Sequence, residues 1–350
     1  MTDIAIVSYA QAPMVRDAGC ANEVELIMPV INEALQACGL ARTDIDFVCS
    51  GSADYLQGAP FAFVAGVDAL GAFPPIKESH VEMDAAWALY ECYLKMLAGD
   101  IDSALIYGFG KSSPGNLPEV LSLQLDPYYL QPLCPDSVSL AALQARAMLD
   151  AGRCTREQMN EVVINSRRQA QKNPRAQLRK PVSQEQLQAE VDWIAPLKKS
   201  DCCPISDGAS ALVICRESQA REMGLPYARV VGMDHRIESH MLGFRDLTDS
   251  PSARNAAKSA GLHNNIEAAE LHAPFSHQEI LLRQSLGLSE NVDINPSGGA
   301  LAGNVMMAAG LDRIGSMAAA ILRGDYKFGL AHATSGPCLQ QNLVTILEAA

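Results

Sequence analysis

Aromatic residues are scarce in this chain of 350 residues. Phe, Trp and Tyr together make up 5% of it, whereas hydrophobic residues make up 48%. A core with few rings has to be filled by smaller side chains, because protein interiors pack at nearly constant density. Since alanine recurs throughout the apolar segments, we expect helices that pack closely against one another through small residues.

Long hydrophobic runs and an excess of positive charge are also missing. No apolar stretch reaches the roughly 20 residues that a helix needs to span a bilayer. The formal net charge of −13 disfavours binding to nucleic acid or to an anionic membrane surface. The opening residues "MTDIAIVSYA" have no basic segment ahead of their apolar run, which indicates a strand and not a signal peptide. We therefore expect a cytoplasmic protein.

The spacing of a metal site and the signature of a phosphate-binding loop are absent as well. None of the ten cysteines forms a CxxC pair, and the adjacent Cys202 and Cys203 have no second cluster to join. We interpret most cysteines as reduced core residues, and we predict no metal and no tightly bound cofactor. The glycine-rich segment from Asp293 to Leu322 lacks the Lys-Ser/Thr of a P-loop, which disfavours a nucleotide site.

Three pairs of segments recur at offsets of 222 to 225 residues, which indicates an internal duplication. Each repeat has the order strand, helix, strand, helix, strand, with a glycine where each helix is expected to end. The pairs are anchored by Val7 and Val231, by Gly39 and Gly261, and by Gly99 and Gly324. Alternating strands and helices predict an α/β fold with helices on both faces of each sheet.

The duplication predicts an N-terminal half at residues 1–225 and a C-terminal half at residues 226–350. A proline-rich and then charged helical insertion interrupts the first half at about residues 113–200. Six basic residues of this insertion form either a solvated helix face or contacts to phosphate groups. They are Arg167, Arg168, Lys172, Arg175, Arg179 and Lys180.

Three segments resemble motifs of the thiolase superfamily, in particular the sterol-carrier-protein-2 type thiolase-like proteins. "CCPISDGASALVI" at residues 202–214 looks like the family's "sDGAaAlv" signature. "AELHAPFSHQEILL" at 269–282 is similar to the segment with the HDCF motif, and "NPSGGALAG" at 295–303 to the loop before the GHP motif. The resemblance implies a five-layer αβαβα sandwich, usually a homodimer, that acts on acyl-CoA thioesters. Coenzyme A would enter as part of the substrate.

The catalytic positions depart from this pattern. Where a thiolase has its nucleophilic cysteine at a helix N-terminus, this chain has Asp84, and Cys92 lies deeper in the helix as a core thiol. Asn304 stands nearest to the histidine of the GHP motif, whereas His272 of the HDCF segment is retained. His332 stands where other thiolases have a further cysteine.

Each predicted catalytic residue has a functional and a structural interpretation. Asp84 is either a helix N-cap or a base, and His332 is either a proton-transfer group or a structural histidine. The resemblance implies that His272 helps to bind the thioester oxygen, unless it is structural, and Asn304 could donate to the same oxygen. The candidates for substrate binding are Gly298, Gly299, Gly303, Ser335, Gly336 and Cys338.

A cavity that binds acyl-CoA without a nucleophile suits retro-aldol cleavage of a 3-hydroxyacyl-CoA, which needs no covalent intermediate. The resemblance to thiolase-like aldolases of steroid side-chain degradation implies such a carbon–carbon lyase. It also implies a small partner protein with a zinc ribbon and an OB-fold. The proline-rich segment "LQLDPYYLQPLCPD" would then cover the acyl end. Two alternatives remain: an acyltransferase subunit that uses Cys338 or a cysteine of a partner, and a non-catalytic subunit that binds a lipid or a partner.

Overall fold

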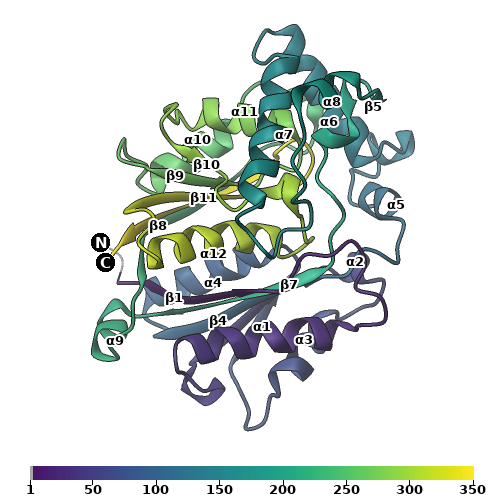
Figure 1. The fold of residues 1–350 in the computed structure, drawn as a ribbon. Coiled ribbons are helices and arrows are strands. Elements are labelled where there is room, and N and C mark those ends of the chain that lie inside the picture. Colours follow the sequence, from purple (N-terminus) through teal and green to yellow (C-terminus); the bar gives the residue numbers. More distant parts are fainter. Residues whose placement is uncertain (1–2) are drawn as a thin grey trace.

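The computed structural model describes residues 3–350 as a layered arrangement of strands and helices (Figure 1). The strands are β1 (Ala5–Gln11), β2 (Phe47–Gly51), β3 (Glu78–Val81), β4 (Ser103–Gly110), β5 (Asp192–Ile194), β6 (Leu197–Lys198), β7 (Gly208–Cys215), β8 (Ala228–Ile237), β9 (Ala268–Leu271), β10 (Asp293–Ile294), β11 (Phe328–Ser335) and β12 (Gln341–Ala349). The α-helices are α1 (Glu23–Ala37), α2 (Asp54–Gln57), α3 (Phe63–Leu70), α4 (Ala85–Ala98), α5 (Leu117–Ser122), α6 (Ser137–Asp150), α7 (Arg156–Ala170), α8 (Gln184–Ala189), α9 (Glu217–Glu222), α10 (Pro251–Ser259), α11 (Ser276–Ser285) and α12 (Ala309–Leu322).

Within residues 3–350, ten strands form one sheet whose two halves repeat the same topology. The order is β10-β9-β11-β12-β8 in one half and β3-β2-β4-β7-β1 in the other. In each half the first three strands are parallel, and the last two run antiparallel to their neighbours. The halves join where β1 pairs with β8, at Ala5 with Arg229 and at Ile6 with Ala228. The duplication inferred from the sequence is therefore present in the strand order.

The two sheet halves enclose a central layer of helices. Figure 1 shows α4 and α12 between them, with α1 and α3 outside the N-terminal half and α10 and α11 outside the C-terminal half. Side chains of α4 and α12, such as Leu89 and Ile314, share one apolar cluster with residues of both sheet halves. This is the predicted five-layer αβαβα architecture.

Small residues let the two central helices approach closely, as the composition led us to expect. A Cβ atom added at Gly310 in α12 would lie 2.6 Å from the Cβ of Ala333 and 2.9 Å from the Cβ of Ala86 in α4. A Cβ at Gly315 would run into the ring of Tyr9. The centre of the molecule therefore has no room for larger side chains along this line of contact.

The insertion contributes α5 to α8 and the β5–β6 hairpin, and it lies beside the C-terminal half (Figure 1). Asp201, which is fully buried, accepts from both Nη atoms of Arg156 at 2.8 and 2.5 Å and from Ser276 Oγ at 2.6 Å. This carboxylate thus links α7 to the start of α11. The halves at 1–225 and 226–350 stay a prediction as domains, although β8 does begin at Ala228.

Four of the six basic residues of the insertion have side-chain partners within the protein. Two of these contacts lie within α7 and the turn after it, where Arg168 donates to Asn165 Oδ1 at 2.6 Å and Lys172 donates to Gln169 Oε1 at 3.0 Å. The other two reach further along the chain. Arg167, which is buried, donates to the backbone oxygen of Leu301 at 2.6 Å, and Arg175 pairs with Glu33 at 2.7 Å. Both contacts are structural.

Within residues 3–350, no helix combines the length and apolarity that crossing a bilayer requires.

Candidate functional site

A cavity of about 410 Å³ lies between the insertion and the C-terminal half. Its walls are mostly apolar, as is typical of ligand pockets. The insertion contributes Leu117, Pro118, Leu121, Leu125, Pro135, Val138, Leu140 and Ala141, and the layers below contribute Ile205, Pro274, Phe275, Met306, Met307 and Leu339. A second hollow, of about 430 Å³, is lined by charged residues around Arg216 and includes none of the predicted site residues.

The proline-rich start of the insertion forms part of the cavity wall. Gln124, Leu125 and Pro135 belong to the segment "LQLDPYYLQPLCPD", and all three line the cavity. Leu125 and Leu140 also pack in one small apolar cluster with Cys338. The insertion and the C-terminal half therefore meet directly at this wall.

His272 and Asn304 lie together at the polar side of the cavity. The ring Nε2 of His272 is 3.1 Å from Asn304 Oδ1, and the backbone N–H of Thr334 donates to His272 Nδ1 at 3.3 Å. Because Nδ1 accepts, the ring proton is on Nε2 and is donated to Asn304. Burial lowers the pKa of His272 to about 3, and the nearby Arg313 guanidinium adds to this effect. The ring is therefore neutral near pH 7.

The same contact orients the side-chain amide of Asn304. Its Oδ1 accepts from His272, and its Nδ2 contacts Met306 Sδ at 3.8 Å, which is a weak acceptor. The backbone N–H of Asn304 is held by Ser206 Oγ at 3.0 Å. Asn304 thus presents an amide donor to the cavity, which both it and His272 line.

Asp84 caps two helices at once. Its Oδ1 accepts from the backbone N–H of Ala86 in α4 at 2.8 Å and of Leu311 in α12 at 3.2 Å. Its Oδ2 accepts from the backbone N–H of Gly310 at 2.8 Å. Burial raises the pKa of Asp84, and these three backbone donors oppose the rise. The N-cap interpretation therefore holds, while the residue also borders the cavity.

His332 does not reach the cavity. It belongs to β11, its side chain is fully buried, and its Nε2 is 2.8 Å from Asn342 Oδ1. Asn342 in turn donates to Ser252 Oγ at 2.7 Å and to the backbone oxygen of Leu339 at 2.8 Å. Burial lowers the pKa of His332 to about 4. The geometry thus favours the structural interpretation of this histidine.

The predicted substrate-binding residues fall into two groups. Ser335, Gly336 and Cys338 line the cavity. Gly298, Gly299 and Gly303 do not, although the sequence predicted a glycine loop that borders the cavity. At Gly298, which has φ of +99°, an added Cβ would lie 2.8 Å from the Cβ of Ala170 in α7.

The glycine loop therefore packs against the insertion helix rather than against a ligand. Gly303 also packs against the protein, since a Cβ there would run into the side chain of Met14 near the N-terminus. Close approach of protein to protein needs glycine for the same steric reason as close approach to a ligand. The residue pattern alone therefore could not distinguish a glycine that packs against the protein from one that packs against a ligand.

The thiols at the cavity are protonated near neutral pH. Among residues 3–350 the cysteines that line it are Cys202, Cys203 and Cys338. Burial raises the pKa of all three, to about 12 for Cys203 and for Cys338. Cys92 is fully buried in the core, with a raised pKa, as expected for a packed thiol. A thiolate nucleophile is thus disfavoured at each position.

Sequence reasoning missed Thr334 and Gln278. Thr334 acts through its backbone N–H, and backbone donors leave no signal in residue type. Gln278 lines the cavity from α11 and donates to Gln144 Oε1 of α6 at 2.9 Å. In residues 3–350 no group of three or more His, Cys, Asp or Glu side chains is placed to hold a metal ion.

Known proteins resemble the chain in sequence. No family model matches it. An acetyl-CoA acetyltransferase of Methanothermobacter thermautotrophicus is 33% identical over 197 residues, which cover 49% of this chain and 51% of the relative. An acetyl-CoA acetyltransferase of Methanocaldococcus jannaschii is 24% identical over 352 residues, which cover 91% of this chain and 89% of the relative. The chain thus spans about half of the first relative and most of the second.

Two solved structures share the fold. The Ltp2-ChsH2(DUF35) aldolase matches with a TM-score of 0.82 and 21% identity, over 99% of this chain and 98% of that one. Human mitochondrial 3-ketoacyl-CoA thiolase matches with a TM-score of 0.80 and 16% identity, over 99% and 98%. The thiolase fold and the resemblance to thiolase-like proteins are thereby confirmed.

Proposed function

We propose that this thiolase-like chain is a carbon–carbon lyase that cleaves a 3-hydroxyacyl-CoA by retro-aldol chemistry. The observation that carries the proposal is Asp84 at the N-terminus of α4. The resemblance to thiolases implies that their nucleophilic cysteine would stand at this position. The three cysteines that line the cavity have raised pKa values, so they do not replace that nucleophile. A reaction without an acyl-enzyme suits such a site.

The bond changes follow from the donors and acceptors at hand. A base removes the proton of the 3-hydroxyl group, the C2–C3 bond breaks, and C3 becomes the carbonyl carbon of a ketone or an aldehyde. The electron pair passes into the thioester, and the resulting enolate takes up a proton at C2 to give a shorter acyl-CoA. The amide N–H of Asn304, oriented by the hydrogen bond from His272 Nε2, would stabilise the enolate oxygen.

Asp84 is the better placed of the two predicted bases. Among residues 3–350 it is the one carboxylate that lines the cavity, whereas His332 does not reach it. A carboxylate has about four acceptor sites. Backbone N–H groups fill three of them here, and the remaining site on Oδ2 would accept the hydroxyl proton.

The substrate and the partners of this chain are also proposals. The apolar wall suits a branched, steroid-type acyl group carried on coenzyme A. The Ltp2-ChsH2(DUF35) aldolase carries a second component in its name, and we propose that a small zinc-ribbon and OB-fold protein accompanies this chain as well. We further propose a homodimer in the cytoplasm.

An assay with two substrates tests the reaction class. The purified protein, alone and with the small partner, is given a branched 3-hydroxyacyl-CoA, and separately a 3-ketoacyl-CoA with free coenzyme A. Mass spectrometry should detect a ketone or an aldehyde and a shorter acyl-CoA from the first substrate. Thiolysis of the second substrate would overturn the proposal, and lack of reaction with either would favour a binding subunit.

Acyl transfer is the second candidate, because the two sequence relatives described above are named acetyl-CoA acetyltransferases. It would require a cysteine such as Cys338, whose thiol donates to the backbone oxygen of Leu140 at 3.4 Å. Peptide mapping after treatment with acyl-CoA distinguishes the two reactions. An acyl adduct on Cys338 supports transfer, and an unmodified Cys338 together with product formation supports the lyase.

A further inference from the structure

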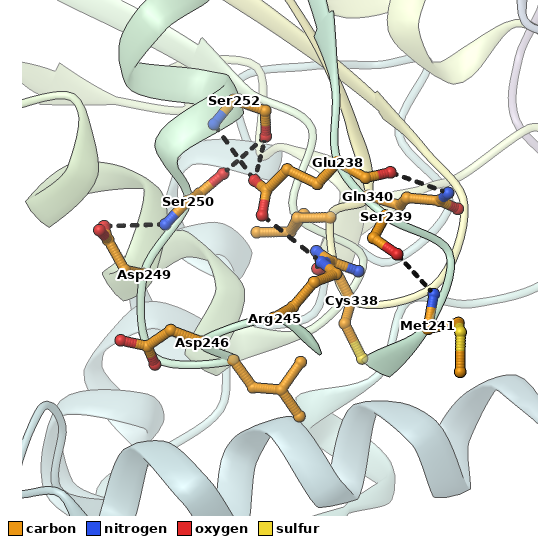
Figure 2. A network of polar contacts seen from close by, with 12 residues as sticks. Glu238, Ser239, Met241, Arg245, Asp246, Asp249, Ser250, Ser252, Cys338 and Gln340 are labelled. Atoms are coloured by element: carbon orange, nitrogen blue, oxygen red, sulfur yellow. Dashed lines mark hydrogen bonds and ion pairs between the residues drawn. The ribbon is translucent and has the colours of Figure 1, made fainter. Parts of the chain in front are cut away.

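The turn at residues 335–340 forms one wall of the cavity and is held from behind by a separate segment. Every residue from Ser335 to Gln340 lines the cavity. The supporting segment is residues 238–250, which connect β8 to α10 and lie against the turn on the side shown in Figure 2. Nothing in the proposed chemistry uses this segment.

Arg245 makes the central contact between the segment and the turn. Its guanidinium donates to the backbone oxygen of Pro337 at 3.0 Å and of Cys338 at 2.6 Å. Its side chain is only 4% exposed, although it lies in a connecting loop. Figure 2 shows it between Glu238 and Cys338. A buried guanidinium that holds two carbonyl groups is a rigid attachment.

The turn needs such an attachment because its backbone is unfavourable. Cys338 and Leu339 are consecutive residues with φ of +54° and +58°. Residues with a Cβ atom disfavour this left-handed region, so two in succession persist only where the surroundings impose them. The side chains of both are buried, and they cannot relax toward solvent.

Glu238 fixes the guanidinium from the other side. One carboxylate oxygen is 3.5 Å from Arg245 Nε, and the other accepts from the backbone N–H of Ser252 at 3.1 Å and from its hydroxyl group. The backbone of Glu238 also bonds to Gln340: its N–H donates to the backbone oxygen of Gln340 at 2.9 Å, and the side-chain Nε2 of Gln340 donates to the backbone oxygen of Glu238 at 3.2 Å. Segment 238–250 and the 335–340 turn are therefore joined at two points, through Arg245 and through Glu238.

We propose that Arg245, oriented by Glu238, is a positioning residue that holds the 335–340 turn and thereby sets which acyl groups the cavity accepts. The first half of this proposal rests on contacts within the protein alone. The second half rests on the proposed acyl-CoA function. Loss of the guanidinium would free Cys338 and Leu339 to leave their left-handed conformation and would widen or collapse the wall.

The first measurement reports on the turn without any substrate. Cys338 is 5% exposed, so its alkylation by N-ethylmaleimide, followed by peptide mapping, should be slow in the wild type. In Arg245→Gln we expect it to be about tenfold faster or more, because the opened turn exposes the thiol. Arg245→Lys keeps one donor and should give an intermediate rate. Cys92, deep in the core, is the internal reference.

Arg254→Gln is the matched control. Arg254 belongs to α10, and it pairs with Asp249 at 2.6 Å, but its side chain is 49% exposed. Labelling of Cys338 should be unchanged in this variant. Unchanged protection of Cys338 in Arg245→Gln, at an unchanged unfolding midpoint, would overturn the positioning role.

The second measurement reports on selectivity. Calorimetry with two saturated acyl-CoA ligands, of short and of long chain, gives the ratio of their affinities for each variant. We expect Arg245→Gln to change this ratio about tenfold, and Arg245→Lys to restore part of it. A freed Cys338 with an unchanged ratio would overturn the selectivity half. If the wild type binds neither ligand, the proposed function fails, whereas the labelling result still decides whether Arg245 holds the turn.

Discussion

At His272 one backbone N–H decides which nitrogen of the ring carries the proton. Thr334 donates to Nδ1, so Nε2 must be the donor, and Asn304 Oδ1 receives its hydrogen. Burial lowers the pKa of the ring to about 3, so this arrangement does not change between pH 5 and pH 8. The pair is therefore suited to donate hydrogen bonds and unsuited to act as a base near neutral pH.

Asn304→Ala removes the amide donor from this pair. If the amide stabilises the enolate oxygen, kcat for retro-aldol cleavage should fall about 10²–10³-fold. KM should change much less, because the contact strengthens mainly in the transition state. Steady-state kinetics on a branched 3-hydroxyacyl-CoA measure both constants, with Asn264→Ala on the exposed surface as control. An unchanged kcat would remove Asn304 from the mechanism.

At the scale of elements, one carboxylate caps the N-termini of two symmetry-related helices. Asp84 bonds to backbone N–H groups of α4 and α12, which occupy equivalent places in the two halves. Both helix N-termini carry partial positive charge, so a shared anion suits them. The central layer is thereby fixed at the point where its two helices meet.

Asp84→Ala should destabilise the protein more than the loss of an ordinary helix cap. Three buried N–H groups lose their acceptor, and we expect the free energy of unfolding to fall by about 3 kcal/mol or more. Asp136→Ala is the comparison, because Asp136 caps α6 through one backbone bond, to Ser139 at 2.8 Å. That variant should cost about 1 kcal/mol. Urea unfolding followed by circular dichroism measures both, and equal losses would contradict the double cap.

Gly310→Ala tests the same junction from the steric side. The added Cβ would lie 2.6 Å from the Cβ of Ala333 and 2.7 Å from Asp84 Oδ1. Neither neighbour has a flexible end that could move away, so we expect a loss of about 1–3 kcal/mol despite the better helix propensity of alanine. Gly243→Ala, at a position with no atom within 4 Å, is the control for thermal unfolding. A gain in stability at Gly310 would show that the helices separate readily.

At the scale of the whole molecule, buried carboxylates make stability depend on pH. Burial raises the pKa of Glu279 to about 7, although Asn295 Nδ2 donates to it at 2.7 Å. A carboxyl group whose pKa is raised by folding stabilises the protein fully below its unfolded pKa of about 4.5. That contribution is lost as pH rises through the folded pKa.

The contribution of Glu279 to the free energy of unfolding should therefore fall between about pH 4.5 and pH 7. The part due to Glu279 is roughly 3 kcal/mol, since each pKa unit corresponds to about 1.4 kcal/mol. Glu279→Gln cannot ionise, so its advantage over the wild type should grow by that amount over this range. Urea midpoints at pH 5 and pH 8 for both proteins measure the difference. A constant difference would mean that Glu279 titrates as it does in the unfolded chain.

The sequence predicted the architecture well because repeats carry information over their whole length. The glycines at 39, 99, 261 and 324 each have a positive φ at a helix end, as their spacing indicated. The site was harder to predict, because a strand residue such as His332 can face a cavity or the core, and only tertiary packing decides which. For Gly298 and Gly299 likewise, the sequence indicates a close contact but does not indicate which surface makes it.

The junction of β1 with β7 and β8 also constrains the order in which the chain can fold. Ala5 pairs with Cys215 and with Arg229, so the first strand waits for partners more than two hundred residues away. At about 5–20 residues per second, a ribosome needs roughly 10–40 s to supply them. During that interval the N-terminal half has β2, β3 and β4 but no antiparallel neighbour for β4. High contact order of this kind slows folding, and the unpaired edge of β4 exposes the nascent chain to aggregation in the meantime.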